Sequence, residues 1–266
     1  EALGEEAARP WFASLYRSAP DPKNQTIKVK TTYKSRDTEK YVYELSDGHC
    51  IETVFIKRRD GGTACVSTQV GCPVGCIFCE SGRHGFFRNL TPSEIVQQVV
   101  LIRRKVNRIV FMGMGEPLDN YQNVLRFLEL VTSPEGLNIG MRHISLSTCG
   151  IVDKIYDLAD RKLQLTLSIS LHAPNDEIRS RTMPVNKRWN MEQLLKACKY
   201  YSTTTGRRIS FEYAMIDGVN DHDWQADLIV KKLRGMPGHV NLIPLNEVAE
   251  SPFKPSRRIA AFQKRL

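Results

Sequence analysis

From residue 91 onward, the sequence alternates between short β-branched, apolar segments and longer amphipathic segments. The strand-like segments cover residues 108–112, 143–146, 165–170, 208–216 and 239–243. The helix-like segments cover residues 95–104, 121–132, 153–161, 191–202 and 223–234, and a capping box that begins at Thr91 precedes the first of them. Strands that alternate with helices predict βαβ units and a parallel sheet.

These five strands, together with one just before residue 72, predict an α/β fold built as a partial (β/α)6 barrel. A doubly wound open sheet is the alternative. In both architectures, ligands bind at the carboxyl ends of the parallel strands.

The amino-terminal part of the chain follows a different pattern. Residues 27–66 alternate between apolar and polar side chains, with turn signals at 46–48 and 60–62, and predict an antiparallel β element of about four strands. Residues 1–20 are typical of a short amphipathic helix. We therefore predict a helical segment at 1–22, an amino-terminal β extension at 23–68 and the barrel at 69–266.

The composition excludes a membrane-spanning chain and a mainly disordered one. No apolar run approaches the roughly 20 residues that a bilayer-spanning helix needs. A content of 41% hydrophobic and 25% charged residues is ordinary for a globular domain. The first 17 residues contain acidic groups and no long apolar core, so they do not predict a secretory signal, and we expect a soluble, cytoplasmic protein.

The charge balance favours a polyanionic partner. Thirty-eight Lys and Arg residues against 29 Asp and Glu residues give a net charge of +9, for which nucleic acid is the first candidate. The basic residues form runs at 28–36, 57–59, 103–105, 231–234 and 257–258. Each run alone is typical of a solvated face or loop, whereas runs that converge on one surface would form a binding site.

Three of the seven cysteines, Cys72, Cys76 and Cys79, lie within eight residues in the spacing C-x3-C-x2-C. Three thiolates on one tight loop can ligate three corners of a [4Fe–4S] cube and leave the fourth iron open. A structural zinc site, with His84 or a distant residue as the fourth ligand, is the alternative. An odd number of cysteines without a secretory signal argues against a disulfide framework.

A second motif, Gly113-Met114-Gly115-Glu116-Pro117, directly follows the strand that ends at residue 112. Glycines at the end of a strand allow the backbone to approach a ligand closely. A carboxylate at that place can receive a ligand ammonium group through a charge-assisted contact. An ordinary glycine turn is the alternative.

The cysteine loop, with Phe78 before its last cysteine, resembles that of radical S-adenosylmethionine (SAM) enzymes. Further motifs follow in one order along the chain, at 63–72, 87–91, 111–118, 147–150, 170–174, 211–213, 218–221 and 241–246. Together they resemble the radical SAM family of 23S rRNA adenine methyltransferases, which contains carbon-2 methylases and carbon-8 resistance methylases. The resemblance extends from about residue 40 to the end of the sequence.

The resemblance implies a radical SAM barrel that binds a [4Fe–4S] cluster and SAM. It assigns the cluster to Cys72, Cys76 and Cys79, and the SAM site to Gly115, Glu116, Ser147, Ser170, Leu171, His172 and Asn246. It also makes Glu52 the general base and gives Cys65 a disulfide that releases the product. Taken alone, Ser147, His172 and Asn246 are typical of turn, core and cap residues. Glu52 alone is typical of a solvent-facing strand position, and Cys65 of a small buried side chain.

The resemblance further implies a reaction that uses two SAM molecules. One methylates a cysteine near the carboxyl terminus, and the other supplies a 5′-deoxyadenosyl radical that abstracts hydrogen from that methyl group. The methylene radical adds to an adenine carbon, the base removes the ring proton, and disulfide formation releases the product. The methylated cysteine lies in a Cys-Gly-Gln motif that the printed sequence does not contain, and Cys149 and Cys198 do not replace it.

We therefore expect the chain as printed to bind the cluster and SAM without methylating RNA. Either the natural protein continues beyond this sequence, or the protein is a divergent member of the family. The segment 1–22 is expected to be a remnant of the family's accessory RNA-binding domain.

The predicted function is methylation of an adenine carbon in 23S rRNA, with tRNA as a further candidate substrate. Carbon 2 is favoured over carbon 8 because Pro117 and Leu118 follow Glu116. The expected partners are RNA and an electron donor such as flavodoxin or ferredoxin, and we expect a monomer that does not bind a membrane. The alternatives are a radical SAM enzyme acting on a peptide or small molecule, and a zinc-containing RNA-binding module without enzymatic activity.

Overall fold

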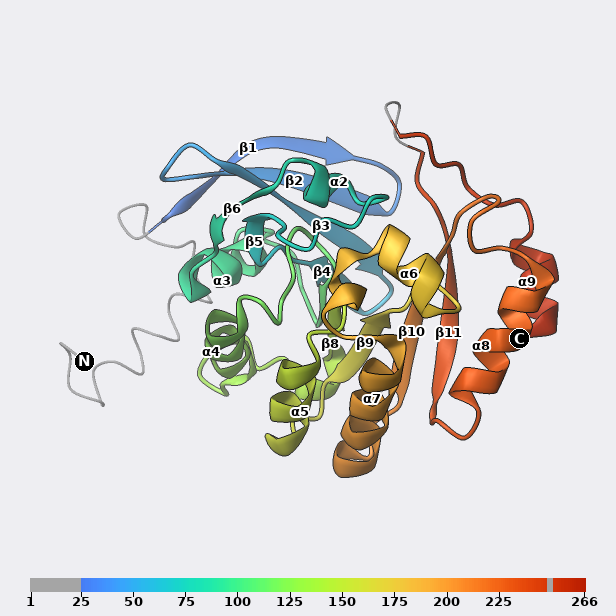
Figure 1. Ribbon diagram of the computed structural model, residues 1–266. Helices are drawn as coiled ribbons and strands as arrows, with labels where there is room; N and C mark the ends of the chain where they lie inside the picture. The colour runs from blue at the N-terminus through green and yellow to red at the C-terminus, as the bar shows by residue number, and fades with distance from the viewer. Residues whose placement is uncertain (1–24, 248–250) are drawn as a thin grey trace. The chain divides into compact units, whose positions relative to one another are not determined.

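The computed structural model describes residues 25–247 and 251–266 (Figure 1). The predicted amino-terminal helix lies outside these residues. The chain divides into two compact units. Unit 1 contains the described residues up to Gly71 and residues Phe86–Leu146, and unit 2 contains Cys72–Gly85 and Ser147–Leu266.

Unit 1 begins with the predicted antiparallel element. Its four strands are β1 (Ile27–Lys34), β2 (Thr38–Leu45), β3 (Cys50–Arg58) and β4 (Gly61–Cys65), and each pairs antiparallel with the next. The tight turn into β4 requires glycine, because a Cβ at Gly62 would lie 2.1 Å from the ring of Phe55. The prediction of about four strands is confirmed.

The last of these strands also begins the parallel part of unit 1. β4 pairs parallel with β7 (Arg108–Phe111), and β7 pairs parallel with β8 (Ile144–Thr148). This part also contains α3 (Pro92–Val100) and α4 (Tyr121–Thr132), and the 3-10 turn η2 (Met141–His143) leads into β8. The capping box between Thr91 and Glu94 forms as predicted, but α3 ends before the predicted residue 104, because Arg103 adopts a φ of +53° in an exposed loop.

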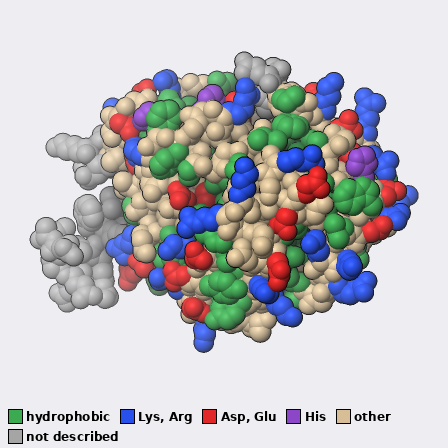
Figure 2. Space-filling model, viewed as in Figure 1, with side chains coloured by type: hydrophobic (Ala, Val, Ile, Leu, Met, Phe, Trp, Pro, Cys, Tyr) green, Lys and Arg blue, Asp and Glu red, His purple; other side chains and the backbone are tan. Residues whose placement is uncertain are grey.

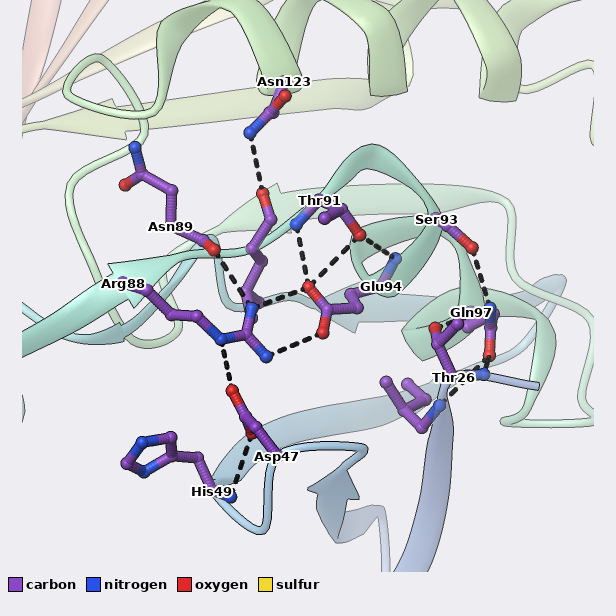
Figure 3. A network of polar contacts seen from close by, with 12 residues as sticks. Thr26, Asp47, His49, Arg88, Asn89, Thr91, Ser93, Glu94, Gln97 and Asn123 are labelled. Carbon is purple, nitrogen blue, oxygen red and sulfur yellow. Dashed lines mark hydrogen bonds and ion pairs between the residues drawn. The ribbon is translucent and has the colours of Figure 1, made fainter. Parts of the chain in front are cut away.

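An ion-pair network joins three segments of unit 1 (Figure 3). Arg88, on β6 (Phe86–Asn89), donates two hydrogen bonds of 2.9 and 3.0 Å to Glu94 of α3 and one to Asp47 in the β2–β3 turn. Burial opposes the charge of Glu94, but the hydrogen bonds from Arg88 and Thr91 outweigh it and hold the pKa of Glu94 below its usual value. β6 also pairs with β5 (Gln69–Gly71), so this network holds the segment that leads into the cysteine loop.

The described part of unit 2 contains three parallel strands. β10 (Ile209–Met215) lies between β9 (Thr166–Ser170) and β11 (Gly238–Pro244). The helices are α2 (Glu80–Arg83), α5 (Val152–Asp160), α6 (Asp176–Thr182), α7 (Met191–Thr205), α8 (Asp223–Leu233) and α9 (Ile259–Arg265), with a 3-10 turn η3 (Pro184–Lys187) after α6. The alternation of strands and helices that the sequence predicts is confirmed, whereas the short elements α2, α6, α9 and β5–β6 were not predicted.

The described residues contain no helix whose length and apolar character would allow it to cross a bilayer.

Candidate functional site

The three clustered cysteines lie half-buried on one loop of unit 2, directly before α2. The loop folds back on itself because Gly75 adopts a left-handed φ of +69°. The N–H of Cys72 donates to the carbonyl of Gly85 (2.9 Å), and the N–H of Cys79 donates to the carbonyl of Cys76 (3.1 Å). These bonds fix the loop at both ends, so the thiols are held on a short, closed segment.

Two contacts fasten this loop to other parts of unit 2. The N–H of Ile77 donates to the carbonyl of Thr182 at the end of α6 (3.1 Å). The ring of Phe78 meets the ring of His172, just after β9, edge to face at 5.1 Å. Phe78 therefore positions the loop against the end of a parallel strand.

The donor set, three thiols on one short loop, fits three corners of an iron–sulfur cube. The described residues contain no group of three or more His, Cys, Asp or Glu side chains that could hold one ion. A tetrahedral zinc with Zn–S bonds of about 2.3 Å draws its sulfur ligands to about 3.8 Å from one another. A cube instead distributes three thiolates over three irons, and so accepts them at wider spacing.

His84, the candidate fourth ligand for zinc, is exposed and contacts Glu80. Its side chain is 70% exposed, and its Nε2 lies 3.1 Å from an oxygen of Glu80. No disulfide joins the seven cysteines, all of which lie in the described residues. In this structure the imidazole of His84 is thus engaged by Glu80.

A buried arginine that the sequence did not single out, Arg179 of α6, organises the strand ends of unit 2. Its side chain is fully buried. The guanidinium donates to the carbonyls of Cys149 (2.5 Å), Ser170 (3.1 Å) and Leu171 (3.3 Å), and to Oδ1 of Asn186 (3.0 Å). Burial lowers the pKa of Arg179, and the neighbouring thiols of Cys149 and Cys76 oppose that change. The charge of this residue thus lies close to the cysteine loop.

The segment that contains Ser170, Leu171 and His172 is held by β10. The N–H groups of Leu171 and His172 both donate to the carbonyl of Glu212, at 3.0 and 3.2 Å. His172 adopts a left-handed φ of +51°, and its carbonyl accepts a hydrogen bond from the side-chain amide of Asn220 (2.8 Å). Because a non-glycine residue with such a φ needs outside support, these bonds keep the loop in its unusual conformation.

His172 is held as a neutral imidazole. Its Nδ1 accepts a hydrogen bond from the backbone N–H of Ala214 (2.9 Å), which places the proton on Nε2. Burial and then the nearby charge of Arg179 lower the pKa of His172 to about 3. At neutral pH, His172 can therefore donate one hydrogen bond through Nε2 without carrying charge.

We expect this buried histidine to make the protein acid-sensitive. In the unfolded chain, His172 takes up a proton below its ordinary pKa of 6.5, whereas in the folded chain it does so only near pH 3. The free energy of unfolding should therefore fall by up to about 1.4 kcal/mol per pH unit as the pH drops from 6.5 toward 3. Urea unfolding at several pH values between 6.5 and 4.5 measures this slope.

The variant His172→Asn should lack that slope, because asparagine accepts the Ala214 hydrogen bond and tolerates the left-handed φ but does not titrate. The exposed His143→Asn serves as the matched control and should keep it. If the free energy of unfolding of His172→Asn fell with pH as steeply as that of wild type, the acid sensitivity would not come from His172.

In unit 1, the Gly113–Pro117 segment packs tightly against the end of β4 and β5. A Cβ at Gly113 would lie 2.7 Å from the backbone of Val66. Gly115 adopts a φ of +98°, and a Cβ there would lie 2.5 Å from the Cβ of Gln69. Both positions exclude any larger residue because the neighbouring chain lies too close to leave room for a Cβ.

Glu116 is buried directly after these glycines. One of its carboxylate oxygens accepts the N–H of Leu118 (2.9 Å), and its own N–H donates to the side-chain oxygen of Gln69 (2.8 Å). Gln69 also donates to Asn89 and Asp119, so it anchors the motif to two other segments of unit 1. Gln69 is a positioning residue that the sequence did not reveal, because its partners lie 20 to 50 residues away.

Glu52 and Cys65 share one face of the β extension. Cys65 pairs with Val54 in the antiparallel β3–β4 ladder, and Glu52 lies two residues from Val54 along β3. Paired residues point to the same side, so Glu52 and Cys65 are diagonal neighbours on that side, a spacing of about 7–8 Å between Cα atoms. Glu52 is exposed and forms an ion pair with Lys40 (2.9 Å). Burial raises the pKa of the Cys65 thiol to about 11.

The remaining assigned residues lie in unit 2. Ser147 is half-buried in β8, and Asn246 is exposed just after β11. The assigned SAM residues are thus distributed over both units, with Gly115 and Glu116 in unit 1 and the others in unit 2.

Comparisons with known proteins agree with these features. Residues 66–228 match the Radical SAM superfamily. The chain is 56% identical over 221 residues, 82% of its length, to the "Probable dual-specificity RNA methyltransferase RlmN" of Thermoanaerobacter sp. (strain X514). It is 47% identical over 247 residues to the protein of the same name from Desulforamulus reducens, covering 91% of this chain and 71% of that protein. The chain spans 65% of the length of the Thermoanaerobacter relative.

Among solved structures, the chain is similar to a radical SAM methyltransferase from Sphaerobacter thermophilus. The TM-score is 0.93 at 39% sequence identity, and the match covers 100% of this chain and 86% of the other.

Proposed function

The chain belongs to the radical SAM superfamily and, within it, to the RlmN family of RNA methyltransferases, and from this premise we propose that the protein methylates an adenine carbon in RNA. The observation that carries the proposal is the closed loop with Cys72, Cys76 and Cys79, anchored through Ile77 and Phe78. The fold class predicted from the sequence, a radical SAM α/β fold, is that of the family.

The proposed cofactors are a [4Fe–4S] cluster and SAM, which together supply a radical able to attack an unactivated C–H bond. The three thiolates would hold the cluster. Glu116 would receive the ammonium group of SAM beside Gly115, and Gly113 and Gly115 let the segment that carries Glu116 pack against Val66 and Gln69. The neutral His172 would donate a hydrogen bond to SAM through Nε2. Ser147, Ser170, Leu171 and Asn246 complete the proposed SAM residues.

Glu52 and Cys65 are proposed to act on the substrate side. Because their side chains lie on the same face of the β extension, the carboxylate and the thiol would act on the same adenine. Lys40 holds the carboxylate of Glu52 in place through its ion pair. With a pKa of about 11, only about one Cys65 thiol in ten thousand is ionised at pH 7, which limits unwanted disulfide exchange before the substrate binds.

Neither buried cysteine of unit 2 is suited to carry the methyl group. Cys149 and Cys198 are buried, and burial raises the pKa of Cys198 to about 12. Because the thiolate is the nucleophile that accepts a methyl group, a buried and protonated thiol is a poor acceptor. This supports the interpretation that neither thiol replaces the methyl-carrying cysteine of the family.

The proposed substrate is adenine, at carbon 2, in 23S rRNA and tRNA, in line with the words "dual-specificity" in the relatives' name. We further propose that an electron donor such as flavodoxin or ferredoxin reduces the cluster, and that the enzyme works in the cytoplasm as a monomer. The net charge of +9 supports a polyanionic substrate.

Binding measurements on the anaerobically reconstituted protein test this function. SAM should bind only to iron-loaded protein, and a tRNA or rRNA-fragment transcript should bind with an affinity that falls steeply between about 50 and 200 mM salt. Mass spectrometry of the RNA tests for methyl transfer to adenine, and efficient turnover would show that a residue of this chain carries the methyl group. SAM binding without salt-dependent RNA binding would overturn the RNA substrate and favour the peptide or small-molecule alternative.

A further inference from the structure

Three basic runs that are far apart in the sequence converge on one pocket of unit 1. The turn after β1, the end of β3 and the loop after α3 contribute Arg36, Lys57, Arg58, Arg104 and Lys105 to its lining. The pocket has a volume of about 280 Å³. On the face shown in Figure 2, Lys and Arg side chains are spread out and interspersed with Asp and Glu. The net charge of the chain therefore does not single out this pocket. The fold does, because it brings distant basic residues together.

The acidic side chains that line the pocket are too few to balance its basic side chains. Among the described residues, only Asp37 and Glu39 line it opposite five cations. Glu39 is already engaged, since Arg104 lies 3.3 Å from one of its oxygens and Tyr41 donates to the other. The side chains of Arg36, Lys57, Arg58 and Lys105 form no hydrogen bond or ion pair with any other described residue. Four cations are thus available to a ligand.

The loops that carry these cations are held by backbone hydrogen bonds. The N–H of Lys57 donates to the carbonyl of Asp37 (2.8 Å), which ties the end of β3 to the β1–β2 turn. The N–H of Asn107 donates to the carbonyl of Gly62 (3.0 Å), which ties the loop after α3 to β4. A neighbouring acid, Asp60, is paired with Arg108 (3.2 Å). A pocket held in this way loses little backbone freedom when it binds an anion.

The pocket lies at the opposite end of β4 from the assigned catalytic cysteine. It includes Gly61, where β4 begins, whereas Cys65 ends the same strand. Four residues of strand separate these ends by about 13 Å. A ligand of the pocket is therefore distinct from the adenine that Glu52 and Cys65 would face.

We propose that this pocket binds backbone phosphates of the RNA substrate, as an anchor remote from the reacting base. The inference rests on the proposed function, because that function supplies the RNA. Exposed Lys and Arg side chains bind phosphates by charge and by releasing counterions, without reading sequence. The anchor should thus strengthen the binding of large, folded RNA and leave SAM binding unchanged.

A charge-removal variant tests the anchor. The triple change Lys57→Gln, Arg58→Gln and Lys105→Gln is compared with wild type for binding of a tRNA transcript between about 50 and 200 mM salt. Each phosphate contact contributes roughly 0.7 to the slope of log affinity against log salt, so loss of three contacts should reduce the slope by about 2. The affinity at the lowest salt concentration should fall roughly tenfold. Thermal unfolding and SAM binding should stay as in wild type, since these side chains form no hydrogen bond or ion pair within the described residues.

The triple change Lys199→Gln, Lys231→Gln and Lys264→Gln removes the same charge from exposed positions on α7, α8 and α9 of unit 2. It should change the slope by less than half as much. Equal losses in both triple variants, or an unchanged slope in the pocket variant, would overturn the anchor while leaving RNA as the substrate. Failure of the wild-type protein to bind RNA would instead overturn the proposed function, and the anchor with it.

Discussion

Replacing Cys76 by alanine is expected to abolish the iron–sulfur cluster, reducing the iron content of the reconstituted protein from about four atoms per chain to below about one. Two remaining thiolates cannot hold three corners of a cube, and no other cysteine belongs to the loop. SAM binding should be lost together with the iron, because the open corner that SAM would occupy no longer exists. Iron assay, the visible absorption spectrum and equilibrium binding of labelled SAM measure the three effects.

The matched control is Cys50→Ala, at a half-buried cysteine on β3 in unit 1. This variant should keep its iron and its colour. A full complement of iron in Cys76→Ala, or zinc in place of iron in wild type, would eliminate the proposed cluster and the function that depends on it.

Replacing Arg179 by methionine is expected to lower the free energy of unfolding by about 3–5 kcal/mol. The change leaves the buried carbonyls of Cys149, Ser170 and Leu171 without this donor, together with Oδ1 of Asn186. A buried acceptor that loses its partner costs about 1–3 kcal/mol. Part of this cost is offset because the buried charge disappears as well. Urea unfolding at neutral pH measures the loss.

Arg181→Met is the matched control for Arg179→Met. It lies two residues away on α6, its side chain is 67% exposed, and its ion pair with Glu177 is long, at 3.8 Å. Exposed pairs of this kind contribute little, so the change should stay within about 0.5 kcal/mol. Equal effects of the two substitutions would show that Arg179 does not hold the strand ends together.

Much of the architecture could be predicted from local pattern. The helix at Tyr121–Thr132 has the predicted bounds, and the Thr91–Glu94 capping box forms as expected, because periodicity and capping depend on residues within one or two turns. The strands before and after the cysteine loop agree with their predicted positions within a few residues. The helices and strands that were not predicted, α2, α6, α9 and β5–β6, are three to seven residues long, too short to show a period.

The candidate site was predictable only in part. The cysteine spacing and the Gly113–Pro117 motif are local, and both fall within the residues that match the Radical SAM superfamily. Arg179 and Gln69 escaped notice because an arginine or glutamine in a polar stretch resembles any surface residue until its partners are known. Those partners are as many as 50 residues distant for Gln69 and 30 for Arg179.

Local sequence thus determined where strands and helices form and which thiols belong together, since both follow from spacing along the backbone. Only the tertiary structure decided how charge is distributed in space. It buried Arg179 beside the strand ends, kept His172 neutral and gathered three distant basic runs around one pocket. The physical reason is that electrostatic energy depends on burial and on neighbours across space, which chain separation does not reveal.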